Sequence, residues 1–106
     1  MTYTIYGIRL KGDREVRYVG LTYRDLKTRL RQHRTTPCVR HLMPWLVEHG
    51  EQVEVFPIAT TENHEEAKTT EKVVISLCVQ LNQRLFNRAH VPPHARWEPG
   101  EEAAAA

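Results

Sequence analysis

The sequence predicts an α+β fold in which a small three-stranded antiparallel sheet is flanked by helices. Residues 3–10, 14–20 and 53–58 are rich in β-branched and aromatic residues, which favour strands. Residues 23–34 and 63–82 contain neither glycine nor proline and carry many helix-forming residues. A chain of 106 residues, of which 41% are hydrophobic and 26% charged, suits a single soluble domain.

The first two extended runs are separated by residues 11–13, Lys-Gly-Asp, which indicate a hairpin turn. If Ile8 lies opposite Val16, Tyr6 lies opposite Tyr18, and both tyrosines stand on one face of the pair. A slip of one residue would give a poorer apolar match and separate the tyrosines. We therefore expect the register that pairs Tyr6 with Tyr18.

The helix predicted over residues 23–34 brings polar groups to an apolar face. At 3.6 residues per turn Leu26, Arg29, Leu30 and His33 fall on one stripe. An arginine and a histidine therefore share the face that the two leucines bury.

Residues 36–50 predict a second helix, with Pro37 in its first turn and Gly50 at its end. Pro44 is expected to kink or split this helix, because an internal proline removes a backbone hydrogen bond. The third strand, residues 53–58, is expected to be ended by Pro57 and by the cap region at Thr60-Thr61.

The last predicted helix, residues 63–82, carries a stripe with alternating four- and three-residue steps. Its members are Ala67, Glu71, Val74, Cys78 and Leu81. A carboxylate on a buried face is costly unless it is paired or binds a cation. Either Arg29 or a metal ion could compensate Glu71.

Together these residues resemble the GIY-YIG nuclease domains, a family that includes homing endonucleases, some restriction enzymes and the nuclease part of bacterial excision-repair proteins. The resemblance covers roughly residues 3–82. The matching positions are Ile5-Tyr6, Tyr18-Val19-Gly20, Arg29, His33, Glu71 and Leu81-Asn82. Thr4 replaces the glycine that names the first motif, and Val19 replaces the isoleucine of the second.

The resemblance implies a metal-dependent DNA endonuclease that hydrolyses phosphodiester bonds. It assigns catalysis to Tyr6, Tyr18, Arg29, His33 and Glu71. Glu71 would hold Mg²⁺ or Mn²⁺, and Arg29 would neutralise charge on the phosphoryl oxygens. We expect Tyr6 to activate the water, His33 to receive its proton and Tyr18 to orient the water or the phosphate, although the opposite assignment of the tyrosines is nearly as plausible. Gly20 and Asn82 would support the local structure.

The charge distribution favours DNA as the partner. Residues 1–40 hold ten lysines and arginines against three acidic residues, whereas residues 41–106 hold five against ten. The nucleic-acid face is therefore expected at the N-terminal part, where basic side chains can contact phosphates without reading sequence. The expected phosphate contacts are Arg9, Arg17, Lys27, Arg31, Arg34 and Arg40.

No run is long and apolar enough to span a membrane, and no secretory signal opens the chain, so a cytoplasmic protein with reduced cysteines is expected. No separate base-reading module is visible. Low sequence specificity follows, with the cut directed by DNA structure or by a partner protein. The alternative is a non-catalytic DNA-binding or tethering module, and the oligomeric state stays open.

A zinc site is the competing interpretation of the histidines. Its candidate ligands are Cys38, His41, His33 and His49, but their spacing matches no standard zinc finger. His41 is expected on a helix surface near the cleft, where it could contact a phosphate.

The domain is expected to cover residues 1–90, followed by a flexible tail over residues 91–106, which is rich in proline and lacks periodicity. Trp97 could anchor this tail to the domain or to a partner. The sequence leaves open whether the four closing alanines are native.

Overall fold

The computed structural model of the protein describes residues 1–37, 39 and 41–98. Three strands form one antiparallel sheet in the order β2-β1-β3. They are β1 (Tyr3–Leu10), β2 (Tyr18–Thr22) and β3 (Val53–Thr61). This architecture confirms the predicted α+β fold.

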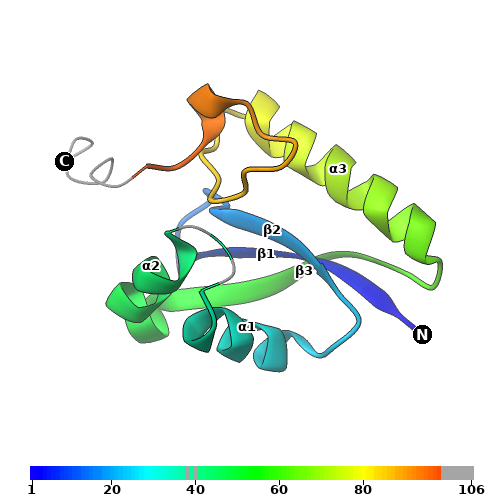
Figure 1. The fold of residues 1–106 in the computed structure, drawn as a ribbon, viewed down its shortest axis with the longest axis horizontal. Helices are drawn as coiled ribbons and strands as arrows, with labels where there is room; N and C mark the ends of the chain where they lie inside the picture. Colours follow the sequence, from blue (N-terminus) through cyan, green and yellow to red (C-terminus); the bar gives the residue numbers. More distant parts are fainter. Residues whose placement is uncertain (38, 40, 99–106) are drawn as a thin grey trace.

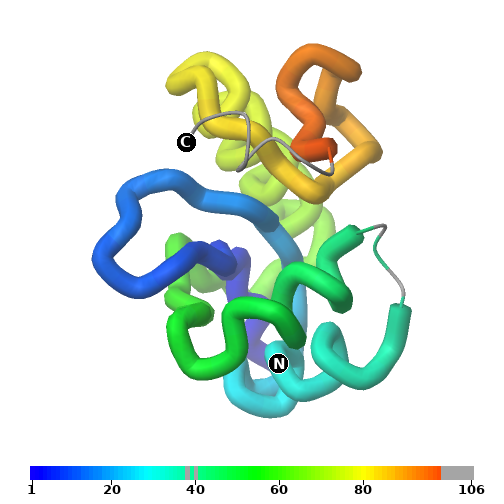
Figure 2. Tube along the Cα trace, turned by 90° about the vertical axis from the view of Figure 1, so that its left-hand side faces the viewer, coloured from blue at the N-terminus to red at the C-terminus, as the bar shows by residue number. Residues whose placement is uncertain are grey.

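The helices cover both faces of the sheet (Figure 1). α1 (Leu26–Thr35) and α2 (Leu42–His49) lie on one face, and α3 (His64–Gln80) lies on the other. Figure 2 shows the same division after a quarter turn, with α3 and the segment that follows it above the hairpin and α1 and α2 below. Short 3₁₀ turns occupy Gly50–Gln52 and Pro93–Ala95.

The hairpin register differs from the predicted one by two residues. Tyr6 pairs with Gly20, not with Tyr18. The connection between the strands is longer than a tight turn, because β2 begins at Tyr18 and the backbone N–H of Val16 donates to Gln83 Oε1 (3.1 Å). An even shift leaves every side chain on its predicted face, so both tyrosines still share a face.

β3 continues past Pro57, so the prediction that the strand ends there is wrong. Pro57 lies opposite Tyr6 and Ala59 opposite Ile5, which leaves Ile58 as the extra residue of a β-bulge. β3 is an edge strand of the sheet. An edge strand with a bulge tolerates a residue that has no N–H to donate.

α1 begins at Leu26, three residues later than predicted, because Asp25 caps it. Asp25 Oδ1 accepts from the Thr28 backbone N–H (2.9 Å), and Asp25 Oδ2 accepts from Thr28 Oγ1 (2.7 Å). Leu26 and Leu30 pack against the core, as the stripe predicted, and His33 is buried with them.

α2 is shorter than the predicted helix over residues 36–50. It begins at Leu42, so Pro37 lies outside it and Pro44 lies in its first turn. The N–H groups of a first turn have no intrahelical partner, so proline costs nothing there and no kink follows.

α3 has Asn63 as its N-cap, whose Oδ1 accepts from the Glu66 N–H (3.0 Å). Its buried residues are Ala67, Ile75 and Cys78. Leu81, which was expected in the buried stripe, is 69% exposed because the helix ends at Gln80 and the chain turns away.

The core has two parts, one on each face of the sheet. The part under α3 comprises Ile5, Val19, Ala67, Ile75, Cys78, Leu85 and smaller neighbours. The part under α1 and α2 comprises Tyr6, Ile8, Leu42, Trp45, Leu46, Phe86 and Trp97 with their neighbours. Cys78 is a buried free thiol, and none of the described helices is long and apolar enough to cross a membrane.

Residues 91–98 belong to the folded domain, so the predicted boundary at residue 90 is wrong for them. Trp97 is 9% exposed and its ring lies 4.7 Å from that of Phe86. Leu85 pairs through its backbone with both Ala95 and Trp97. Trp97 therefore anchors this segment, as the sequence suggested. The rest of the expected tail, residues 99–106, lies outside the described residues.

Candidate active site

The hydroxyl of Tyr6 is the centre of a buried polar cluster. Tyr6 is 0% exposed, and its Oη lies 2.7 Å from Nε2 of His33. Arg29 donates from Nε to the same oxygen (3.2 Å). Both partners project from one face of α1, so the helix stripe predicted from the sequence delivers two polar groups to one strand residue.

Gly20 makes room for this hydroxyl. A Cβ at Gly20 would lie 2.3 Å from both Cζ and Oη of Tyr6. Because Tyr6 and Gly20 are paired across β1 and β2, the tyrosine ring lies over the glycine. The glycine of the second motif is therefore required by the close approach of an aromatic ring.

His33 is neutral at physiological pH. Burial, helped by the positive charge of Arg29, lowers the pKa of His33 from its ordinary 6.5 to about 4. Arg29 Nε can only donate to the Tyr6 oxygen, which leaves the Tyr6 proton free to point at Nε2 of a neutral His33. In this arrangement Tyr6 donates to a histidine that can accept its proton.

Tyr18 borders the same cluster and is half-buried, in contrast to Tyr6. Its ring meets that of His33 edge-on at 5.1 Å and lies 6.2 Å from the ring of Tyr6. Four of the five predicted catalytic residues therefore come together. Gln32, which the sequence did not single out, accepts from Arg29 Nη1 (3.1 Å) and so orients the guanidinium.

Glu71 lies on α3, whose buried residues pack on the opposite face of the sheet from Tyr6. Among the described residues, no hydrogen bond or ion pair joins Glu71 to the tyrosine cluster. Burial raises the pKa of Glu71, while His90 and Lys72 act in the opposite direction. Within residues 1–37, 39 and 41–98, the Glu71 carboxylate makes no hydrogen bond or ion pair, so the expected pairing with Arg29 is absent, and His90 and Lys72 offset its burial only in part.

A half-buried carboxylate without a partner fits a ligand of a hard cation, since carboxylate oxygens are the ligands that Mg²⁺ prefers. The described part of the chain contains no group of three His, Cys, Asp or Glu residues that could hold a metal. A cation at Glu71 would therefore have one protein ligand and complete its shell with water and substrate oxygens.

The amide that supports the site is Asn87, not the expected Asn82. Asn82 is exposed after α3, with a left-handed backbone (φ 60°). Asn87 accepts from the Val19 N–H (2.9 Å) and donates to the Val19 carbonyl (2.7 Å). It thereby holds β2 between Tyr18 and Gly20. Both asparagines follow a large apolar residue, so residue type alone could not distinguish them.

The predicted phosphate contacts differ in their availability. Lys27 and Arg31 are exposed on α1. Arg9 stacks on Phe56 (4.0 Å) and pairs with Glu54, on the face of β1 away from Tyr6.

Arg17 and Arg34 are also engaged. Arg17 pairs with Glu15 (2.8 Å), and Arg34 donates to the Gly50 carbonyl (2.7 Å), which ties α1 to the end of α2. Arg40 lies outside the described residues. Two of the six predicted contacts, Lys27 and Arg31, are thus exposed without a structural ion pair to another element.

Among the described residues, no cluster of histidine, cysteine and acidic side chains could bind zinc. His33 is bound to Tyr6, His49 packs on Trp45 (ring centroids 4.8 Å), and Nε2 of His41 lies 3.9 Å from Glu98. Cys38 lies outside the described residues. His41 precedes α2 with a left-handed backbone (φ 67°), beside Trp97 and not on an open helix surface.

Comparison with known proteins identifies one family that matches the chain. The family described as the GIY-YIG catalytic domain matches residues 2–84, a span that holds Tyr6, Tyr18, Arg29, His33 and Glu71. No curated protein and no solved structure matches the chain significantly. Since the family match covers most of the 106 residues, this protein belongs to the GIY-YIG family of nucleases.

Proposed function

We propose that the protein is a divalent-metal-dependent DNA endonuclease of low sequence specificity. The observation that carries the proposal is the shared hydrogen bonding of Tyr6 Oη by His33 and Arg29. Tyr6 and His33 are buried and Arg29 is half-buried, and both helix residues bond to the hydroxyl of the strand residue. A purely structural core would seldom bury this set, because each polar group needs a partner in place.

Burial favours Tyr18 as the tyrosine that meets the substrate. Tyr6 is 0% exposed and its hydroxyl is occupied by two protein partners, whereas Tyr18 is half-buried beside His33. A residue that activates water must reach it. We therefore assign Tyr18 to the water and Tyr6 to positioning His33 and Arg29, which is the opposite of the assignment favoured from the sequence.

In the proposed reaction the oxygen of a water attacks phosphorus as the bond from phosphorus to the leaving oxygen breaks. Tyr18, in its deprotonated phenolate form, orients the water and takes its proton, and the leaving oxygen departs with the electron pair of the broken bond. A phenol has an ordinary pKa near 10, so it needs nearby positive charge to act as a base at neutral pH. Arg29 supplies positive charge at the cluster, and its planar donors suit the phosphoryl oxygens.

Nucleases of this family generally depend on a divalent metal ion. In this chain Glu71 would hold it. When bound there, the ion would neutralise charge that develops on the leaving oxygen. Glu71 and the tyrosine cluster lie on opposite faces of the sheet, so the proposal requires the substrate to contact both from the side of the edge strand β2.

Sequence specificity is expected to be low. Lys27 and Arg31 on α1 are placed to contact phosphates, which carry no sequence information. The choice of cut site then depends on the structure of the DNA or on a protein partner.

The test is cleavage of supercoiled plasmid and of a branched DNA, with and without Mg²⁺ or Mn²⁺. We expect metal-dependent nicking that Tyr18→Phe and Glu71→Gln abolish. Tyr23→Phe and Glu66→Gln are matched controls, because both residues are exposed outside the cluster. Salt-sensitive DNA binding without cleavage under either metal would favour the alternative of a non-catalytic binding module.

A further inference from the structure

The outer side of α3 carries an exposed apolar line. Val73, Leu77 and Leu81 are 52%, 51% and 69% exposed and follow one another at four-residue steps. Val73 and Leu77 lie four apart on α3, and Leu81, its C-cap residue, keeps the helical hydrogen bond from its N–H to the Leu77 carbonyl (3.0 Å), so the three form a continuous line over two turns. A single exposed leucine is ordinary, whereas an apolar line along one helix indicates an interaction surface.

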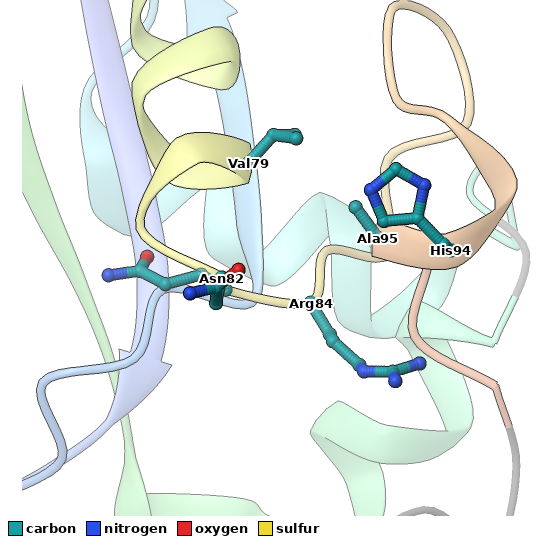
Figure 3. Close-up of a pocket in the computed structure, with 6 residues that line it drawn as sticks. Val79, Asn82, Arg84, His94 and Ala95 are labelled. Carbon is teal, nitrogen blue, oxygen red and sulfur yellow. The ribbon is translucent and has the colours of Figure 1, made fainter.

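The charges at the two ends of this line are opposite. The chain entering α3 and its first turn carry Glu62, Glu65 and Glu66, all exposed. Beyond the other end, Arg84 and His94 line a cavity of about 240 Å³ with Val79 and Ala95, as Figure 3 shows. Glu65 pairs with Lys68 (3.2 Å), so the acidic character at the start of the line comes from Glu62 and Glu66, whereas the middle is apolar and the end carries Arg84 and His94.

We propose that two copies of this chain dimerise by packing their α3 helices antiparallel. A twofold axis through Leu77 places Val73 against Leu81 of the partner subunit, and each Leu77 against its own counterpart. The same operation places the acidic start of one helix alongside the basic end of the other, twice. A surface that is complementary to itself under a twofold rotation closes into a dimer.

A second copy accounts for both observations. An unrelated acidic partner would contact the basic end alone and leave the apolar line unexplained. Binding to a lipid surface would require basic residues along the whole line. Antiparallel self-pairing uses the apolar line and both charged ends. The proposed active-site cluster lies on the other face of the sheet, so dimerisation through α3 leaves it uncovered.

The first test is the oligomeric state of the purified protein by sedimentation velocity across the micromolar range. We expect a concentration-dependent dimer. Leu77→Glu should give a monomer, because it places two like charges at the axis. Val47→Glu is the matched control, since Val47 is equally apolar and 65% exposed but lies on α2. A monomer at every concentration, or a dimer that Leu77→Glu leaves intact, would overturn the proposal.

The second test addresses the antiparallel arrangement. Arg84→Glu alone and Glu66→Arg alone should each weaken the dimer at low salt by about fivefold or more, and the two together should restore most of the affinity. Failure of the double variant to restore dimerisation would contradict the antiparallel pairing. Circular dichroism melts verify that each variant is folded. These readouts are independent of DNA cleavage, so they stand or fall separately from the nuclease proposal.

Discussion

The two faces of the sheet bury polar groups in different ways. Under α1, Tyr6, His33 and Arg29 satisfy one another through hydrogen bonds. Under α3, an otherwise apolar layer contains Glu71, whose burial raises the pKa and which has no bonded partner among the described residues. A satisfied polar cluster contributes to the stability of its own geometry, whereas an unsatisfied carboxylate lowers stability.

This difference separates two kinds of functional residue. Changes to Tyr6, His33 or Arg29 should affect folding and activity together, because the same bonds serve both. A change at Glu71 should affect them in opposite directions, because its charge is needed for a cation and is unfavourable for the fold. The predictions below test that separation.

The largest expected effect is on cleavage by Tyr18→Phe. Loss of a positioned proton acceptor should lower the cleavage rate by roughly 100- to 10,000-fold, with a smaller change in melting temperature than at Tyr6, because Tyr18 is half-buried and Tyr6 is fully buried. Tyr6→Phe should instead lower stability by roughly 1–3 kcal/mol, because His33 and Arg29 lose a buried partner. Single-turnover cleavage and thermal melts of the two variants measure this. If Tyr6→Phe mainly lowered cleavage and Tyr18→Phe mainly lowered stability, Tyr6 would be the residue that activates the water.

The next effect is a loss of stability in acid that originates at His33. The folded pKa of about 4 lies below the ordinary 6.5, so below pH 6.5 the unfolded chain binds a proton that the folded chain does not. Stability should fall as pH falls from 6.5 towards 4, by roughly 3 kcal/mol over the window. Urea melts at each pH should show the slope. The slope of stability against pH should become smaller in His33→Gln. It should persist in the control His94→Gln, because His94 is exposed.

A smaller effect is expected for Gly20→Ala. The new Cβ would overlap Tyr6, and displacing the ring should cost roughly 1–3 kcal/mol and reduce cleavage as the Tyr6 hydroxyl leaves its partners. A double-mutant cycle with Tyr6→Leu measures the coupling. If the glycine matters only through the close approach of the ring, the cost should be much lower in the Tyr6→Leu background. Equal costs in both backgrounds would refute this account of the glycine.

The smallest effect is a gain of stability in Glu71→Gln. Because the folded pKa is raised, the carboxyl favours the folded state when protonated, and this contribution is lost as pH rises through the folded pKa. At neutral pH the variant should therefore melt at a slightly higher temperature than the native protein. The gain in free energy of unfolding should be less than about 1 kcal/mol. The difference should vanish in acid. A variant that melts lower at neutral pH would show that Glu71 is structurally compensated.

Much of the site was predictable because it depends on local periodicity. The placement of Arg29 and His33 on one stripe of α1 follows from helical geometry alone. β1 matches its predicted range of residues 3–10. The common face of Tyr6 and Tyr18 survived an error of two residues in register, since side chains alternate with a period of two. The sequence also contained the motifs of the family that the comparison identified.

Other features depended on segments distant in the sequence. The register of β2 follows from hydrogen bonds that Gln83 and Asn87 make to the hairpin, and these residues lie more than sixty positions away. The burial of residues 91–98 depends on Trp97 packing against Phe86. Neither contact has a periodic signal along the chain.

The sequence by itself determined the type and order of the main strands and helices, the stripe of α1 and the residues available for catalysis, because these follow from spacing and residue type. The tertiary structure decided which tyrosine is enclosed, which asparagine supports β2 and on which face Glu71 lies. Burial and pairing depend on how distant segments pack together, and no local pattern encodes that.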